Sequence, residues 1–366
     1  MAGEAGHRTV STYELLEQSV TAALDLQRDD GSFPPGQNGV YDESETPVRT
    51  TSHWLNTLAH VYELTGDETF ANSAIAAADY LLGEEARPHG YTFHSRNEGQ
   101  DRCDGLVGQS PAIRSLANVG AILDRPEIKA AAEEVFMLHP FDDRLGIWER
   151  VEIDGRRLSF DRTLNHQIHF ASAGAYLADD EIDRMIRQFL EKLSDTLRTY
   201  RNGLIKHFLR PPPILVLKTL SSDRSRWNLL WNEIMFHYYS RSRDHRRKET
   251  GYHVVNLAAL SHLKRQYPDH EFWTSDEIRR AIRYLDERST DGNVNYGSLL
   301  PGIQTAIALH VLDDQPVEEV KTFVASDLES KFDFESNLMV NDTVDPMYQA
   351  ASIVHLTILP DLYVSI

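Results

Sequence analysis

The chain has 366 residues, of which 41% are hydrophobic and 25% are charged. This is the composition of a folded globular protein, and it excludes a disordered chain, a collagen-like chain and a disulfide scaffold. The 37 basic and 56 acidic side chains give a net charge of −19. That charge argues against nucleic acid or an anionic membrane as the main partner, because both are recognised through basic surfaces.

The basic residues are mostly arginine. Only eight of the 37 are lysine, and the first of them is Lys129. A surface rich in carboxylates and poor in lysine is typical of proteins from a high-salt cytoplasm, because a dense shell of carboxylates keeps the protein hydrated and soluble. We therefore expect a halophilic protein, with an acidic mesophilic protein as the alternative.

Three features of the chain favour a cytoplasmic protein without a transmembrane segment. Cys103 is the single cysteine, which excludes an intrachain disulfide and a thiolate metal cluster. Residues Met1 to Val10 are polar and contain no apolar run of signal-peptide length. No stretch approaches the roughly 20 apolar residues needed to cross a bilayer.

Hydrophobic residues recur mainly at helical spacing. The first helical segment follows Ser11, which has capping-box spacing to Glu14, and the segment runs to Leu24. The second and third helical segments are 53–64 and 70–82. Further helical windows lie, in chain order, near 109–123, 127–137, 163–177, 180–200, 226–241, 251–266, 275–287, 302–312, 316–328 and 346–358.

Short and long connections alternate between these segments. Residues 65–67 and 177–180 form short joints, whereas 28–48, 84–108 and 138–162 are long and polar. Stacked helical hairpins produce this alternation, because their short turns collect at one end and their long loops at the other.

One pair of strands is predicted inside the third long loop. Residues 147–153 and 157–160 flank Asp154-Gly155, a favoured two-residue hairpin turn. The sequence therefore predicts an all-α fold, an (α/α)6 toroid of six helical hairpins that spans 1–366 as a single domain, with a small β-hairpin in one long loop. An open α-solenoid is the alternative, but no fixed period of about 34 residues is present.

The long loops contain aromatic, His, Arg, Asp and Asn residues together. This mixture suits a sugar, because aromatic faces stack on the ring while amide and guanidinium groups bond to hydroxyls and carboxylates. In the first such cluster, Arg49, His53 and Trp54 stand at the start of a helix, where a bound anion is favoured. The alternative is a helix cap at Thr51 or Ser52 with Trp54 in the core.

The second cluster lies in the loop 84–108 and at the start of the next helix. Asp104 is interpreted as a carboxylate at the floor of the funnel, with Arg102 lowering its pKa. An Asp in a tight turn is the alternative reading. The glycines of this loop are too few and wrongly spaced for a phosphate loop. The other candidate saccharide-binding residues of this cluster are His94, Arg96 and Gln109.

The third cluster follows the predicted hairpin. Trp148 lies in its first strand, and the hairpin delivers Asp161 to the mouth of the next helix, which carries Asn165 and His166. An Asp and a His at one junction between loop and helix are suited to act as general acid and base. The alternative is that Asp161 only caps the helix.

The remaining candidates lie in the second half of the chain. Tyr252, His253 and Tyr296 are suited to stack on sugar or to transfer protons, with a place in the core as the alternative. The basic run Arg241 to Lys248 is interpreted as a solvated loop. Neither a His-Glu-x-x-His zinc motif nor a Gly-x-Ser-x-Gly serine elbow occurs, so we expect neither a metal nor another cofactor.

Four strings together resemble a known family. They are Thr46–Leu55, Cys103–Gln109, His139–Asp142 and Phe160–Gln167, and they are similar to motifs of the AglQ-like (α/α)6-barrel family of surface-glycan and N-glycosylation gene clusters. That family is more distantly similar to unsaturated glucuronyl hydrolases and glucuronyl C5-epimerases. The resemblance implies action on a hexuronic-acid-containing glycan, free or lipid-linked, with contact to the inner membrane surface through a lipid-linked substrate.

The resemblance also implies residue roles, and it leaves three activities open. In the hydrolases two Asp residues are the working pair, and their motif positions correspond to Asp104 and Asp161. A hydrolase would use Asp161 as acid, while a second carboxylate or His166 activates water. An epimerase would remove the C5 proton with His166 or a Tyr, while an Arg stabilises the enolate. The scarcity of facing carboxylates favours the epimerase, and a non-catalytic glycan-binding toroid is the third reading.

Overall fold

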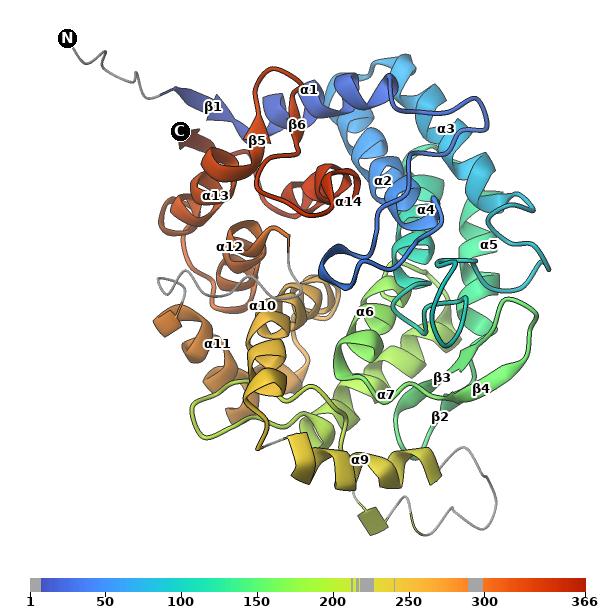
Figure 1. Cartoon of the computed structure of the whole chain (residues 1–366), viewed down its shortest axis with the longest axis vertical. Helices are drawn as coiled ribbons and strands as arrows, with labels where there is room; N and C mark the ends of the chain where they lie inside the picture. Colours follow the sequence, from blue (N-terminus) through green and yellow to red (C-terminus); the bar gives the residue numbers. More distant parts are fainter. Residues whose placement is uncertain (1–7, 212, 215–216, 218–226, 240, 289–298) are drawn as a thin grey trace.

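The computed structural model of the chain describes residues 8–211, 213–214, 217, 227–239, 241–288 and 299–366. In these residues, inner helical segments form a closed ring in which each packs on the next and the last returns to the first (Figure 1). The ring consists of α2 (Val48–Thr65), α4 (Ser110–Ile122), α6 (Leu164–Gly174), α10 (Arg243–Gln266), α12 (Pro301–Leu312) and α14 (Pro346–Ala351), which continues into η4 (Ser352–Ile358). This closed ring confirms the predicted (α/α)6 toroid.

Outer helices cover the ring with one apolar side each. α7 shows the pattern, because Ile182, Ile186, Phe189 and Leu193 are buried and recur at helical spacing. Inner and outer helices enclose one continuous hydrophobic core, and the single domain stays a prediction. The outer helices are α1 (Thr12–Leu24), α3 (Glu68–Leu82), α5 (Pro126–Met137), α7 (Asp180–Thr196), α11 (Asp276–Arg288) and α13 (Val317–Lys331).

Several helix ends follow directly from local chemistry. Ser11 caps α1, where its hydroxyl accepts a hydrogen bond from the Glu14 N–H at 3.2 Å. Asp67 and Asp179 cap α3 and α7 in the same way. Gly66 ends α2 in the left-handed conformation at a φ of +71°, which a residue without a side chain adopts readily. These signals make the short turns predictable.

The connections alternate in length, as the sequence indicates. Three residues or fewer join α2 to α3 and α4 to α5, whereas more than 20 residues join α1 to α2, α3 to α4 and α5 to α6. Short turns therefore lead from an inner to an outer helix, and long segments lead back. Consequently the first turns of the inner helices and the long segments lie at the same end of the barrel, which we call the mouth.

The long segment before α6 contains the predicted hairpin. Strands β3 (Ile147–Val151) and β4 (Arg157–Phe160) pair antiparallel, and Gly155 takes a φ of +81° in the turn between them. The sequence did not predict the third strand of this sheet, β2 (Phe141–Asp142), which pairs with β3. Two further antiparallel pairs are β1 (Thr9–Ser11) with β7 (Tyr363–Ser365) and β5 (Phe332–Asp333) with β6 (Leu338–Met339).

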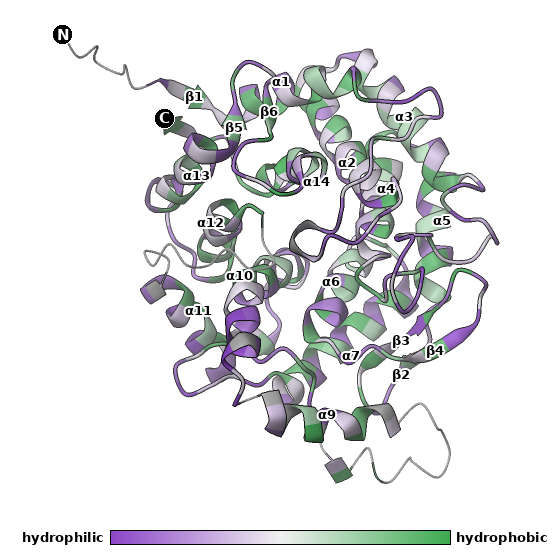
Figure 2. Cartoon of the chain, viewed as in Figure 1, coloured by the Kyte–Doolittle hydropathy of each residue, from purple (hydrophilic) through white to green (hydrophobic). Residues whose placement is uncertain are grey.

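The main departure from the predicted elements concerns α10. Ser242 caps this helix by accepting a hydrogen bond from the His245 N–H at 3.3 Å, so α10 begins at Arg243. The interpretation of 241–248 as a solvated loop is therefore wrong, because most of this run forms the first turns of an inner helix. Figure 2 shows these first turns and β4 as hydrophilic parts of the molecule.

The remaining elements are short or peripheral. They are η1 (Gly39–Tyr41) in the first long segment, α9 (Trp227–Tyr239) before α10, and η3 (Glu271–Thr274) before α11. Within the described ranges, none of the helices combines the length and the apolar character needed to cross a bilayer.

Candidate active site

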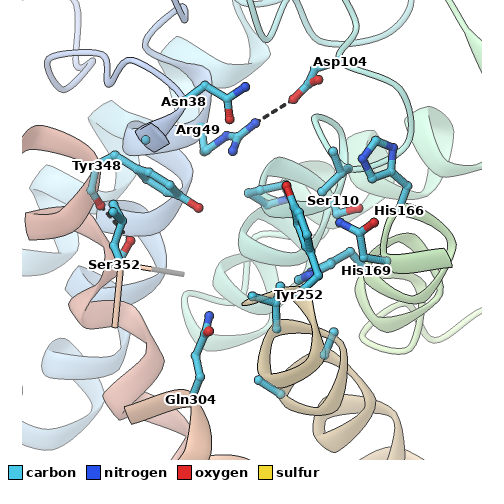
Figure 3. A pocket seen from close by; sticks show the side chains of 18 of the residues that line it. Asn38, Arg49, Asp104, Ser110, His166, His169, Tyr252, Gln304, Tyr348 and Ser352 are labelled. Atoms are coloured by element: carbon cyan, nitrogen blue, oxygen red, sulfur yellow. Dashed lines mark hydrogen bonds and ion pairs between the residues drawn. The ribbon is translucent and has the colours of Figure 1, made fainter. Parts of the chain in front are cut away.

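The centre of the ring holds a cavity of about 330 Å³, a volume within the usual range of small-molecule sites. Every inner helix contributes to its wall, and the long segments at the mouth add Asn38, Glu43 and Asp104 (Figure 3). Polar side chains dominate this wall. They include Arg49, His53, Arg96, Arg114, Asn165, His166, His169, His207, Lys248, Tyr252, His262, Gln304, Tyr348 and His355.

Near the mouth, two arginines neutralise Asp104. The Arg49 Nη2 atom lies 2.7 Å from Asp104 Oδ2, and the Arg96 Nη1 atom lies 3.0 Å from Asp104 Oδ1. Arg49 also pairs with Glu45 at 3.0 Å. Both carboxylate oxygens of Asp104 are thus ion-paired. The expected pairing with Arg102 is wrong, because the Arg102 side chain is exposed at the surface and does not line the cavity.

Asp104 is also held by its backbone. It takes a φ of +53°, and the following Gly105 takes +58°. A side chain at Gly105 would meet Asp161 Oδ2 at 2.6 Å, so this position requires a residue without a Cβ. The tight turn of the alternative reading is therefore present, and it holds the Asp104 carboxylate at the cavity wall.

His166, which is partly buried on α6, pairs with the buried Asp161 just before that helix. The His166 Nδ1 atom lies 2.8 Å from Asp161 Oδ2, which also accepts a hydrogen bond from the Leu106 N–H at 3.2 Å. Burial opposes the charged form of both groups, but their mutual attraction outweighs it. The pKa of His166 is raised above its usual value, and the pKa of Asp161 is held below its usual range.

The two members of this pair have different access to the cavity. His166 lines it, and Asp161 does not. The Asp161 carboxylate lies behind His166 and is only 5% exposed as a residue. This geometry does not suit the expected direct protonation of a glycosidic oxygen by Asp161. The carboxylate instead orients the His166 ring and stabilises its protonated form.

Deeper in the cavity lies a group of neutral histidines. Burial lowers the pKa of His169 and of His355 to about 3, and it lowers the pKa of His53 and His262 well below the usual value. The positive charge of Arg114 adds to the lowering in all four cases. These rings are therefore neutral at physiological pH and available as bases or hydrogen-bond partners.

Arg114, on α4, is the charged residue at the centre of this group. Its Nη1 atom lies 3.0 Å from His262 Nε2, and His262 Nδ1 lies 2.8 Å from the Tyr176 hydroxyl. Burial lowers the pKa of Arg114, and no carboxylate of the described residues opposes this effect or pairs with the guanidinium. Arg114, His262 and His355 also line a second hollow of about 270 Å³, so they form the floor of the cavity.

The ring order places catalytic candidates on opposite walls. α6 is the third inner helix and α14 with η4 is the sixth, so they face each other across the cavity. His166 and His169 lie on α6, and His355 lies on η4. Figure 3 shows His166 and His169 on one side of the cavity and Tyr348 and Ser352 on the other. A flat ligand between these walls presents one face to each.

Six further sequence-predicted site residues are among those that line the cavity. Asn165, Tyr252 and His53 do so, together with Arg49, Arg96 and Asp104. Tyr252 reaches the Tyr41 hydroxyl at 2.7 Å, and the His53 ring lies 5.6 Å from that of Tyr348. The sequence thus found residues of the mouth, but it wrongly placed Asp104 at the floor. It missed Arg114, His169 and His355 at the floor.

The structure places the predicted tryptophans in the core. Trp54 packs on Phe33 at a ring distance of 5.9 Å, and Trp148 packs between Phe136 and Phe170. Both are at most 2% exposed, because their side of the helix or strand turns toward the interior between the helical layers. The expectation that they contact a saccharide is therefore wrong, because neither tryptophan lines the cavity.

Three other predicted residues do not line the cavity. Two of them are held by structural hydrogen bonds instead. The Gln109 amide bonds to both backbone groups of Phe93, and His253 lies between the Ile205 N–H and the Ala281 carbonyl. His94 is half-buried and does not line the cavity. Gln109, His253 and His94 are therefore not part of the candidate active site. Tyr296 lies outside the described residues.

A metal centre has no support in the described part of the chain. No cluster of three or more His, Cys, Asp or Glu side chains with metal-binding geometry occurs there. The expectation of a site without metal or other cofactor stays a prediction.

Comparison with known proteins places the chain in a family. No family model matches it. Over 365 residues it is 39% identical to archaeal glycosylation protein Q of Haloferax volcanii. The match covers 96% of this chain and 98% of the Haloferax protein. The chain belongs to the family of archaeal glycosylation protein Q. This relationship agrees with the resemblance seen in the sequence motifs.

Solved structures show the same barrel in more distant proteins. The cellobiose 2-epimerase of Bacillus thermoamylovorans matches with a TM-score of 0.65 at 10% identity, over 95% of this chain and 98% of that one. The α-1,6-mannanase of Salegentibacter sp. HEL1_6 matches with a TM-score of 0.55 at 12% identity, also over 95% and 98%. At such identities the similarity shows the fold alone.

Proposed function

We propose that the chain is a carbohydrate-active enzyme that epimerises or isomerises a hexuronic-acid residue of a saccharide. One observation carries this proposal: at the cavity floor, the partly buried guanidinium of Arg114, which has no carboxylate partner among the described residues, is surrounded by neutral histidines. Membership in a glycosylation-protein family and a barrel shared with a sugar epimerase add support.

The proposed ligand group for Arg114 is the sugar carboxylate. A buried cation without a counter-ion is unfavourable, because burial removes its hydration without supplying a partner. A carboxylate is the natural complement, since it accepts two parallel hydrogen bonds from one guanidinium. A uronate bound in this way has its C6 carboxylate at the floor and its C5 atom within the group of histidines. The rest of the saccharide then extends toward Tyr252 and Tyr41 at the mouth.

The same placement supplies the proton-transfer chemistry. The C5 hydrogen of a uronate is acidic because the adjacent carboxylate takes up the charge as an enolate, and Arg114 stabilises that charge. A neutral base and a protonated acid on opposite faces of C5 are then required for inversion. His355 on one wall is neutral, and Asp161 favours the protonated form of His166 on the other. A substrate carboxylate on Arg114 would neutralise the positive charge that adds to the lowering of the His355 pKa, which makes this ring a stronger base when substrate is bound.

A hydrolase of the two-carboxylate type is the alternative. That mechanism needs one carboxyl group to protonate the leaving oxygen and another to act on the sugar or on water. Of the described carboxylates that line the cavity, Asp104 is bound by two arginines and Glu43 pairs with Arg96 at 3.3 Å. Neither is placed as a free acid, which favours the epimerase. A non-catalytic glycan-binding protein is the remaining alternative.

We also propose that the protein works in a salt-rich cytoplasm. Its low lysine content and charge of −19 support this, as does its 39% identity to a Haloferax volcanii protein. The single cysteine, Cys103, is buried and free, which suits a reducing compartment.

The test is incubation with a uronate oligosaccharide in heavy water at high salt, followed by mass spectrometry and NMR. The proposal predicts deuterium at C5 and the inverted epimer, with no new reducing end. A new reducing end without deuterium at C5 would establish the hydrolase instead. Binding without either product would establish the glycan-binding protein.

A further inference from the structure

Helix α9 exposes an apolar side to the exterior of the barrel. Trp227, Trp231, Ile234 and Tyr238 are 55%, 57%, 58% and 71% exposed. Their spacing of four, three and four residues places them on one side of the helix. Half of the exposed large hydrophobic residues of the described chain lie between Ile214 and Tyr238. Scattered exposed apolar residues are normal in proteins, but such a cluster marks an interaction surface.

The opposite side of α9 fixes the helix to the barrel. Leu229 is 2% exposed and belongs to the core, and the buried Asn232 amide donates a hydrogen bond to the Leu209 carbonyl at 2.8 Å. The apolar side is therefore not the face that packs on the barrel. The apolar side faces outward, and the contacts of Leu229 and Asn232 fix its orientation relative to the barrel.

Basic residues stand beside this apolar face. Residues 241–248, which follow α9 directly, contain five Lys or Arg and one acidic residue, in a chain whose net charge is −19. Arg241, Arg243, Arg246 and Arg247 are exposed. Figure 2 shows the first turns of α10 as a hydrophilic region next to α9. The strongest exposed apolar cluster thus adjoins a locally positive surface.

The location of α9 ties this surface to the cavity mouth. α9 packs against β4, which ends directly before Asp161, and it leads into α10, which supplies Lys248 and Tyr252 to the cavity wall. Figure 1 shows α9 at the edge of the barrel, by the β2–β3–β4 sheet whose strand β4 it contacts. Whatever binds α9 is therefore near the entrance of the site.

We propose that α9 and the first turns of α10 dock the protein on an anionic lipid bilayer. Trp and Tyr side chains concentrate at the level of lipid headgroups, because their rings are partly apolar and partly polar. Interfacial helices combine such residues with arginines that attract anionic headgroups. High salt screens the arginines, so the apolar side chains keep the protein bound in a salt-rich cell. From the net charge alone we expected no anionic membrane as a partner. The net charge does not show that the surface at α9 and the start of α10 is locally positive.

A second copy of the chain fits this surface less well. Dimers are mostly symmetric, so each copy would present the same patch. Such pairing would bring the two arginine clusters together, between chains that each carry a charge of −19. Charge complementarity therefore favours an anionic lipid surface over a second copy.

The test is flotation of the full-length protein with lipid vesicles at about 0.2 M and about 2 M KCl. We expect binding to vesicles of equimolar phosphatidylglycerol and phosphatidylcholine, and weaker binding to pure phosphatidylcholine. The double variant Trp227→Ser/Trp231→Ser should bind at least about tenfold more weakly. The double variant Arg243→Gln/Arg247→Gln should lose the preference for anionic vesicles. Tyr363→Ser, which changes an aromatic residue on β7 that is 67% exposed, is the matched control and should bind as wild type.

Three results would overturn the proposal. The wild type fails to float with anionic vesicles, the double tryptophan variant binds as well as the control, or light scattering reveals a dimer that the same double variant abolishes. Bromine-labelled lipid adds a direct readout, because it should quench Trp227 and Trp231 but not the buried Trp54 and Trp148. Vesicle binding is measured without saccharide, so its outcome is independent of the proposed reaction.

Discussion

Two arginines enter the same cavity from neighbouring inner helices, and their surroundings differ completely. Arg49 of α2 forms ion pairs with Glu45 and Asp104 and lies over the Tyr348 ring at 5.4 Å. Arg114 of α4 has a neutral His262 as its hydrogen-bond partner and forms no ion pair with a described carboxylate. One guanidinium is neutralised by carboxylates of the protein, whereas the other has no counter-ion among the described residues.

The difference separates a structural cation from a ligand-binding one. The charge of Arg49 is already neutralised, so a second anion there would have to displace Glu45 or Asp104. A carboxylate that binds Arg114 displaces no carboxylate and gains a charge-assisted pair. Two residues of the same type in one pocket thus have different expected roles, and substitution distinguishes them.

The largest expected effect is on turnover after Arg114→Gln. We expect kcat/KM for a uronate substrate to fall about 10³-fold, because both the carboxylate contact and the stabilisation of the enolate are lost. Stability should not decrease, since the variant removes a partly buried charge and leaves no carboxylate of the described residues without its cation. Steady-state kinetics and chemical denaturation measure the two quantities.

Arg49→Gln is the matched variant for stability. It leaves Glu45 and Asp104 without their shared cation, so the free energy of unfolding should fall by about 3 kcal/mol. Equal destabilisation by the two substitutions would contradict the distinction between a structural Arg49 and a ligand-binding Arg114. A loss of turnover confined to Arg49→Gln would contradict it as well.

The next effect concerns the two walls of the cavity. His355→Gln and His166→Gln should each lower kcat about 10²-fold, since each removes one of two proton-transfer groups. Binding of the substrate should persist because Arg114 is unchanged. Deuterium exchange at C5 and a separate binding measurement check both statements. Full activity in either variant would remove that histidine from the mechanism.

A smaller effect is expected behind His166. Asp161→Asn removes the carboxylate that raises the pKa of His166, so the limb of the pH–rate profile that reports His166 should move to lower pH. We expect kcat at neutral pH to fall about tenfold, because less of the ring is protonated and its orientation is less fixed. An unshifted profile would show that Asp161 acts only on stability.

The smallest effect is predicted for Arg102→Gln. This arginine resembles Arg49 and Arg96 in sequence context, but its side chain is exposed and does not line the cavity. Kinetic constants for the uronate should stay within about twofold of wild type, as expected for a surface substitution away from the site. A large loss of kcat/KM in this variant would mean that the substrate contacts surface residues beyond the cavity.

The sequence predicted the barrel because its evidence is local. Helical periodicity, the cap at Ser11, and the alternation of short and long connections each depend on neighbouring residues. The Asp154-Gly155 turn revealed the hairpin for the same reason. The start of α10 was misplaced because the charged run Arg241 to Lys248 conceals the cap at Ser242.

The candidate site was only half predictable. Residues at the mouth, such as Arg49 at the start of α2 and Asp104 in a loop, stood out because polar residues gather there in the sequence. Arg114 and His355 lie inside helical segments, where sequence alone does not tell which side faces the cavity. Arg114 did leave one signal, since it is a charged residue between the buried Ile113 and Ser115. Trp54 and Trp148 misled because large aromatics suit both a sugar and a core.

The most direct test of the account is the affinity of the protein for D-glucuronate and for its neutral amide, measured by calorimetry on wild type, Arg114→Gln and Arg49→Gln. We expect wild type to prefer the carboxylate by at least about tenfold, and we expect Arg114→Gln to abolish this preference. Arg49→Gln should retain it. A preference that survives in Arg114→Gln, or one that vanishes only in Arg49→Gln, would contradict the assignment of Arg114 as the carboxylate-binding residue.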